Sequence, residues 1–404
     1  MEAASISRVR RGLTGKIREP KVTVRTKMGE IAQEMDDVIA MGPGDPDLAT
    51  PQHIIEAAKA ALDAGATHYT PPPGDPRLRA AVAGRINDAQ RIAYDPASEI
   101  IITTGAEEAI YMALVSLVDA GDEVLVPEYR FTTYDWGTEL SLGTVVEYPT
   151  VFPGDEYRLD AGEIAKRLTD RSKILVIASP DNPTGGVASK DAIVAVARLA
   201  RERDLIVITD EIYHPFVFDG AEHHSVLHEP DMRQRTLLVD GFSKAYAMTG
   251  WRVGYLAGPA DFMRSIIEVK HALSICAPAV SQAAALAAIQ GPQDCVAEHL
   301  AIYDDRRHTL MAALTDMGLG FVRPEGAFYV WVNVSSTGMS AEEFVYRLLL
   351  DTGVLISPGT IFGHGGEDYM RMSLLVPRDR IEAAVERMEG VIAKYRAEAG
   401  GHVR

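Results

Sequence analysis

One lysine lies shortly after an apolar run that predicts a buried strand. Lys244 follows Thr236–Val239, with a serine hydroxyl beside it at Ser243 and an arginine eight residues later at Arg252. Removing a lysine from water lowers the pKa of its ammonium toward the range in which the amine forms imines. The segment therefore indicates carbonyl chemistry at Lys244, although a lysine on a surface loop is the alternative when the segment is taken alone.

Polar side chains also follow two other apolar runs. Asn182 comes shortly after one of them, and Asp210 and Tyr213 come after the next. Because ligand sites in open α/β sheets lie at the carboxyl ends of the strands, these three side chains can converge on one planar, hydrogen-bonding ligand. Each alone has a structural interpretation, as a turn residue, a helix N-cap and a core aromatic, but their joint occurrence near Lys244 favours a site.

A turn between a predicted strand and a predicted helix offers a place for an anion. The turn runs from Thr103 to Glu108, with Gly105 where the helix begins. Free backbone N–H groups and the positive end of the helix dipole suit a phosphate at such a position. The signal is weak by itself, because many strand-to-helix turns look similar.

Short β-branched runs separated by helix-length segments position these groups. The predicted strands are Ile100–Thr103, Glu123–Val126, Ile174–Ala178, Leu205–Thr209 and Thr236–Val239. The predicted helices begin at Thr50-Pro51, with Thr50 as N-cap, and at Asp75-Pro76, or span Ser189–Arg203. Continuous apolar strands alternating with helices predict an α/β domain whose largely parallel sheet is covered on both faces.

The last third of the chain has a different pattern. Its predicted elements are a helix at Pro292–Met317, a half-exposed strand at Ala327–Val334, a helix at Ala341–Asp351, strands at Val354–Ile356 and Met370–Leu374, and a closing helix with Ile381, Val385, Met388, Ile392 and Tyr395 on one face. We therefore predict an N-terminal arm (1–49) that packs with a small α+β domain (291–404), and a large domain (50–290) between them.

The composition is that of a globular protein with an acidic balance. Of 404 residues, 47% are hydrophobic and 24% charged, and the formal net charge is −17. This acidity argues against a nucleic acid or an anionic membrane as partner, because those surfaces attract basic patches. Two cysteines, Cys276 and Cys295, are too few for a disulfide framework, so we expect reduced thiols and a cytoplasmic location.

Two segments are assigned no chemistry. Met1–Lys21 is rich in arginine and lacks the apolar core of a secretory signal, so we predict a solvated or docking arm, with a transit peptide as the alternative. The histidines at 223, 224 and 228 are predicted to lie in a solvated loop, and no metal is expected.

As a set, the motifs resemble the class I/II aminotransferases, which are fold-type-I pyridoxal-phosphate enzymes of the aspartate aminotransferase superfamily. The segments that carry the resemblance are Tyr69-Thr70-Pro71 with Gly74, Asn182-Pro183-Thr184-Gly185, Asp210-Glu211-Ile212-Tyr213, Ser243-Lys244 with Arg252, and Tyr369–Ser373. It covers Met41 to Leu374 and implies a mostly parallel, seven-stranded-type sheet between helices, a smaller α+β domain, and pyridoxal 5'-phosphate as cofactor.

The resemblance implies a role for each catalytic residue. Lys244 would form an imine with the cofactor aldehyde and then move a proton as the general base. Asp210 would pair with the pyridine nitrogen and keep it protonated, and Asn182 and Tyr213 would hydrogen-bond the ring oxygen. Phe131 takes the position of the aromatic residue that covers the cofactor ring, with Tyr129 as the alternative.

The resemblance also implies a phosphate site and a substrate site. Ser243, Arg252 and the backbone near Gly105, Ala106 and Glu107 would hold the phosphate, and Tyr69 would reach the phosphate of a partner subunit in a homodimer with shared active sites. Arg371 would clamp the substrate carboxylate, with Asn182 beside it and with Gly44 leaving room for it.

The implied reaction is ping-pong transfer of an amino group between an amino acid and a 2-oxo acid through pyridoxamine phosphate. The alternative on the same machinery is a β-eliminating C–S lyase. A transcriptional regulator is disfavoured, because the residues before Thr50 are too few for a DNA-binding domain.

The substrate is expected to be a neutral or aromatic amino acid rather than aspartate. Prokaryotic aspartate-using relatives carry a lysine at the position of Glu107, where a glutamate would repel a second carboxylate. Glutamate would still serve as donor if Arg130 reached its side chain. The candidate wall residues are Trp136, Ile361, Phe362 and His364.

Overall fold

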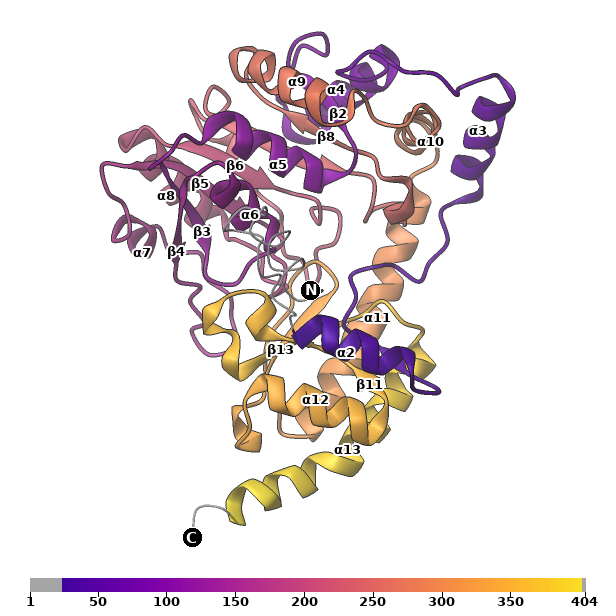
Figure 1. Ribbon diagram of the computed structural model, residues 1–404, viewed down its shortest axis with the longest axis vertical. Helices are drawn as coiled ribbons and strands as arrows, with labels where there is room; N and C mark the ends of the chain where they lie inside the picture. Colours follow the sequence, from indigo (N-terminus) through magenta and orange to yellow (C-terminus); the bar gives the residue numbers. More distant parts are fainter. Residues whose placement is uncertain (1–23, 402–404) are drawn as a thin grey trace, which may run out of the picture.

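The computed structural model describes residues 24–401, which form a larger upper part and a smaller lower part (Figure 1). A long helix, α11 (Asp294–Asp316), runs from one part into the other, as the orange ribbon in the figure shows. Residues 1–23 of the predicted arm lie outside the described residues, as does the segment for which a transit peptide is the alternative.

A seven-stranded sheet forms the centre of the larger part, in the order β2-β8-β7-β6-β5-β3-β4. The strands are β2 (Ile100–Thr103), β3 (Glu123–Pro127), β4 (Thr144–Tyr148), β5 (Ser172–Ala178), β6 (Ile206–Asp210), β7 (Thr236–Gly241) and β8 (Gly254–Ala257). The two pairings of β8, with β2 and with β7, are antiparallel, and the other pairings in this sheet are parallel. The predicted α/β class with a mostly parallel sheet is confirmed.

Helices cover both faces of this sheet. They are α3 (Gln52–Asp63), α4 (Pro76–Gln90), α5 (Ala106–Leu117), α6 (Thr133–Leu140), α7 (Ala161–Ala165), α8 (Lys190–Glu202), α9 (Ala260–Ser274) and α10 (Ala279–Gln290). In β5, Ile174 and Val176 pack into the core shared with α5 and α9, whereas Leu175 and Ile177 pack into the core shared with α8. Alternate residues of a strand face opposite sides, so a continuous apolar run needs helices on both.

The sequence predicts Thr50 as the N-cap of α3, and this prediction is wrong. The helix begins at Gln52 behind Pro51, with no side-chain cap. The Thr50 hydroxyl instead donates to the carbonyl of Ala247 at 2.7 Å and accepts from the Trp251 indole at 3.0 Å. Tertiary contacts thus outweigh the local capping preference, and they tie this segment to the loop that carries Lys244.

The smaller part is built on a four-stranded antiparallel sheet, in the order β12-β13-β10-β9, beside a two-stranded pairing of β1 with β11. Its further elements are α2 (Val24–Gln33), β1 (Ile39–Ala40), β9 (Gly320–Val322), β10 (Tyr329–Asn333), α12 (Ala341–Thr352), β11 (Val354–Leu355), β12 (Ser357–Pro358), β13 (Tyr369–Ser373) and α13 (Arg378–Gly401). Met28 and Ile39 belong to its core, so the described end of the arm packs here.

The prediction of a half-exposed strand at 327–334 is wrong, because β10 is buried on both faces. Val330 and Val332 pack into the core of the smaller part, whereas Trp331 lies in an aromatic cluster with Tyr129 and Phe362. Trp331 stacks on Tyr369 with ring centroids 5.3 Å apart. The second face is covered by residues from the larger part, which local alternation does not reveal.

No helix between residues 24 and 401 is both long enough and apolar enough to cross a bilayer. Both cysteines, Cys276 and Cys295, are free thiols.

Candidate active site

Lys244 lies in the loop after β7, half-buried between aromatic rings. Its Nζ donates to the carbonyl oxygen of Gly44 at 2.7 Å and lies 5.7 Å from the ring centre of Phe328 and 5.9 Å from that of Tyr213. Burial lowers the pKa of the Lys244 ammonium, and the nearby Arg371 cation also lowers it. The amine is therefore poised toward its neutral, nucleophilic form.

Asp210 is the last residue of β6 and is buried. Its carboxylate accepts a hydrogen bond from the Tyr134 hydroxyl at 2.7 Å and one from the backbone N–H of Ile212 at 3.2 Å. Burial raises the pKa of Asp210, while the bond from Tyr134 opposes that shift. A buried carboxylate of this kind is stabilised by a cation, such as a protonated ring nitrogen, placed against it.

Sequence reasoning missed the role of Tyr134. This residue is fully buried on α6, and its only signal in the sequence is its place one helical turn after Phe131. The two rings meet edge to face, with centroids 6.5 Å apart. Tyr134 therefore links the position predicted to cover the ring with the carboxylate predicted to hold the ring nitrogen.

Arg371 lies in β13, between two aromatic rings. Its guanidinium carbon is 4.0 Å from the ring centre of Tyr329 and 4.4 Å from that of Phe362. One terminal nitrogen donates to Asn182 Oδ1 at 2.7 Å and the other to the carbonyl of Gly42 at 2.6 Å. The rings and acceptors fix the plane of the guanidinium fork, which is what two-point binding of a carboxylate needs.

The segment 42–44 joins the two cations. Gly42 accepts from Arg371, and Gly44 accepts from Lys244. A Cβ at Gly44 would collide with the Tyr329 hydroxyl, which is itself 3.1 Å from the hydroxyl of Tyr213. The structure thus brings Gly44, Asn182, Tyr213, Lys244 and Arg371 around one space, with segments that are far apart in the sequence.

The turn before α5 has the geometry of an anion site. Gly105 has a φ of +84°, and the Arg252 guanidinium lies so close that a Cβ there would be 2.6 Å from its Nη2. A Cβ at Gly254 would in turn lie 2.8 Å from the backbone nitrogen of Ala106. The two glycines thus let a cation and the first N–H groups of α5 approach one another closely, and Ser243 lies buried in the same loop as Arg252.

Three other predicted positions differ in surroundings. Tyr129 is buried in the aromatic cluster with Trp331, and its hydroxyl donates to the carbonyl of Gly365 at 3.1 Å, so it is a core residue and not a candidate to cover the ring. Glu107 is exposed and accepts from Thr133 at 3.0 Å. Tyr69 has 79% of its surface exposed, in the segment between α3 and α4.

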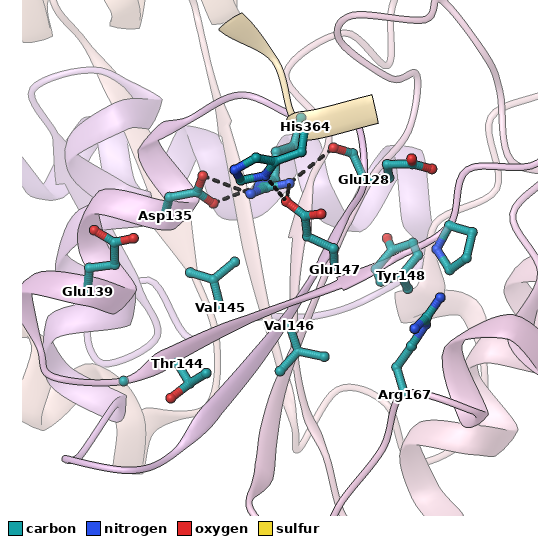
Figure 2. A pocket seen from close by; sticks show the side chains of 13 residues that line it. Glu128, Asp135, Glu139, Thr144, Val145, Val146, Glu147, Tyr148, Arg167 and His364 are labelled. Carbon is teal, nitrogen blue, oxygen red and sulfur yellow. Dashed lines mark hydrogen bonds and ion pairs between the residues drawn. The ribbon is translucent and has the colours of Figure 1, made fainter. Parts of the chain in front are cut away.

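Arg130 lines a pocket beside the edge strand β4, and Lys244 is not among the residues that line it (Figure 2). Its guanidinium makes two bonds to Asp135, at 2.6 and 2.8 Å, and an ion pair with Glu147 at 2.9 Å. The figure shows these two carboxylates with His364 beside them. The Arg130 guanidinium is therefore already paired with carboxylates of the protein, and this geometry does not support the prediction that it reaches the side chain of a glutamate substrate.

The prediction of a solvated histidine loop is wrong for His223. This ring is largely buried and pairs with the buried carboxylate of Glu211 at 3.0 Å. Glu211 also accepts from Ser225 at 2.6 Å and Thr209 at 3.0 Å. The charge and hydrogen bond of His223, together with the bond from Ser225, outweigh burial and lower the pKa of Glu211 to about 2. The residue after Asp210 thus anchors the loop that contains His223.

Comparison with known proteins agrees with this geometry. The model of the family aminotransferase class I and II matches residues 36–388. The chain is 40% identical to an aspartate aminotransferase of Pyrococcus abyssi, over 91% of this chain and 94% of the relative. It is 37% identical to aromatic-amino-acid aminotransferase 2 of Thermococcus litoralis, over the same shares. The solved aromatic aminotransferase of Pyrococcus horikoshii superposes with a TM-score of 0.87 at 39% identity, covering 91% of this chain and 99% of that one.

Proposed function

This chain belongs to the class I and II aminotransferases, and from that premise we propose that it moves an amino group from a neutral or aromatic amino acid to a 2-oxo acid. It is an amino acid aminotransferase that depends on pyridoxal 5'-phosphate. The observation that carries the assignment of the site is the junction at 42–44, whose carbonyls contact both Lys244 and Arg371. A reactive amine and a carboxylate clamp thus face the same space.

The donor set fits the cofactor, which supplies an aldehyde and an electron-withdrawing ring. We propose that Lys244 binds the aldehyde and that Asp210 pairs with the ring nitrogen. Asn182 and Tyr213 hydrogen-bond the ring oxygen, and Phe131 covers the face of the ring. We assign the phosphate to Ser243, Arg252 and the backbone of Gly105, Ala106 and Glu107. Burial of Asp210 against Tyr134 and the close contact of Arg252 with Gly105 support these assignments.

Lys244 is also the group that moves a proton at the substrate Cα. Its lowered pKa favours the neutral amine, which can accept a proton there and return it elsewhere. Arg371, held between two rings, fixes the carboxylate and hence the direction of the Cα–H bond. The fork is rigid because its hydrogen bonds to Asn182 and Gly42 are short.

We further propose a homodimer with shared active sites, acting in the cytoplasm. Tyr69 supports the first point, because a large aromatic side chain with 79% of its surface exposed is available to a second copy of the chain. The free thiols support the second. The domain boundaries near 50 and 290 are part of the same proposal.

Arg371→Leu tests the substrate site. We expect KM for amino donors to rise about 10²- to 10³-fold, because a buried charge-assisted pair is lost. Arg371→Lys keeps the positive charge but lacks the two-pronged guanidinium, so its KM should lie between that of Arg371→Leu and that of the wild type. Steady-state rates with a panel of donors check this, and an unchanged KM in Arg371→Leu would overturn the assignment. Pyruvate and ammonia release without an oxo-acid acceptor would favour the lyase.

Glu107→Lys tests the substrate preference. Glu107 is exposed at the start of α5, and a glutamate there disfavours a donor with a second carboxylate. We expect kcat/KM for aspartate to rise about tenfold in the variant, while that for phenylalanine changes little. Glu139→Lys, the same charge change at an exposed position of α6, is the matched control. Fast aspartate turnover by the unmodified enzyme, relative to neutral and aromatic donors, would contradict the proposed preference.

A further inference from the structure

We propose that Lys270 is a positioning residue for the cofactor phosphate: through Glu108 it holds the turn at Thr104–Ala106 in the form that receives the anion. This inference rests on the phosphate site assigned above. Lys270 lies on α9 and is fully buried. It acts on the phosphate site through Glu108 and Thr104.

Lys270 is the centre of a hydrogen-bonded cluster under the turn. Its Nζ donates to Glu108 Oε2 at 2.7 Å, to Ser274 Oγ at 2.8 Å and to Thr104 Oγ1 at 3.4 Å, which uses the three protons of the ammonium. Glu108 also accepts from Ser274 Oγ at 2.6 Å and from the backbone N–H of Thr104 at 2.5 Å. The carboxylate therefore connects α9 to the residue just before Gly105.

The position of Glu108 explains why it needs a cation. It is the third residue of α5, the position from which a glutamate side chain commonly reaches back to the N–H of the N-cap residue, here Gly105. Such a bond would occupy a donor proposed for the phosphate and would place a carboxylate beside that anion. Lys270 and Ser274 hold Glu108 on Thr104 instead, so the N–H groups that follow stay available.

The pKa of Glu108 agrees with this arrangement. Burial alone would raise it, but the hydrogen bonds from Lys270, Ser274 and Thr104 outweigh burial and lower it. The cluster therefore keeps the glutamate ionised and its charge neutralised. A buried glutamate without its lysine would be an uncompensated negative charge close to a phosphate.

The backbone is strained directly after the last residue of α9, Ser274. Ile275 has φ +62° and ψ −64°, and the N–H of Cys276 donates to the carbonyl of Ser274 at 2.7 Å, which makes a γ-turn. A β-branched residue rarely adopts a positive φ, so the surrounding structure must impose it. The turn ends α9 directly after Ser274, at the point where its hydroxyl meets Glu108.

The test compares two cofactors that differ only in the phosphate. Equilibrium binding of pyridoxal phosphate and of pyridoxal to the apoenzyme is measured for the wild type and for Lys270→Met. We expect the affinity for pyridoxal phosphate to fall about 10- to 100-fold, with the affinity for pyridoxal changed by less than about threefold. Lys270→Arg, which keeps the charge, should recover part of the loss. Equal losses for both cofactors, or no loss, would overturn the proposal.

A milder variant and a control distinguish a specific effect on the phosphate site from a general loss of stability. Ser274→Ala removes the two hydrogen bonds of the Ser274 hydroxyl and leaves the Lys270–Glu108 ion pair, and it should still weaken the binding of pyridoxal phosphate selectively, by about threefold to tenfold. Arg307→Met removes another fully buried cation, whose partners Asp219 and Asp304 are partly exposed, and should leave the ratio of the two affinities unchanged. A wild-type enzyme that bound both cofactors equally would overturn the phosphate site itself, which separates that failure from a failure of Lys270 alone.

Discussion

Replacing Lys244 with alanine will remove the covalent link between the protein and its cofactor and will lower kcat about 10⁴-fold, near the upper end of the effect of one acid–base group. The loss follows from position, because Lys244 is the amine that lies between the Gly44 carbonyl and the rings of Tyr213 and Phe328. Borohydride reduction of the holoenzyme followed by peptide mass spectrometry measures the link directly.

Lys59→Ala is the matched control for this experiment. Lys59 is exposed on α3, where it pairs with Glu56, so its removal should change neither labelling nor turnover. A Lys244→Ala protein that still becomes labelled by borohydride at another lysine, or that turns over at a comparable rate, would contradict the assignment of the reactive amine. Circular dichroism of each variant shows whether the fold is retained.

Asp210→Asn will lower kcat about 10²- to 10³-fold while the cofactor stays bound, the range seen when a preorganised electrostatic partner is removed. The variant keeps the shape of the side chain, and the Tyr134 hydroxyl can still donate to the amide oxygen. What it removes is the negative charge that would keep the ring nitrogen protonated. Donor-dependent half-reaction rates, followed by absorbance, measure the effect.

Tyr134→Phe separates charge from hydrogen bonding at the same position. It leaves the Asp210 carboxylate and removes its donor, so we expect a loss of about tenfold, equivalent to about 1.4 kcal/mol. If Tyr134→Phe is as damaging as Asp210→Asn, then the carboxylate charge is not what matters most. A turnover of Asp210→Asn within a few fold of wild type would sink the assignment of Asp210 altogether.

The sequence was most informative for the central strands, because a continuous apolar run has one main explanation, burial on both faces of a sheet. Apolar runs that are buried on both faces predicted β2, β3, β5, β6 and β7, and polar residues after three of them predicted where Asn182, Asp210 and Lys244 lie. The runs for β4 and β8 were not predicted. β4 is a partly exposed edge strand, and β8 opens on a glycine and lies antiparallel, so neither has the pattern of a central parallel strand.

Contacts between distant segments could not be predicted in the same way. Thr50 has the local signature of an N-cap but bonds to Ala247, and Arg130 is a plausible substrate ligand by its place in the chain but is held by Asp135. Tyr134 and Lys270 take their roles from single partners in other elements, Asp210 and Glu108. Which hydroxyl or amine meets which carboxylate depends on tertiary packing, and spacing along the chain does not encode it.

The junction at 42–44 has a consequence for how the protein is made. Gly42 bonds to a residue 329 positions later, and Gly44 to one 200 positions later. A polypeptide emerging from the ribosome therefore completes the site around Lys244 only after β13 has been synthesised, 329 residues after Gly42. A chain whose translation stalls before β13 lacks the arginine proposed to clamp the substrate carboxylate, so such a fragment would not turn over substrate even with vitamin B6 bound.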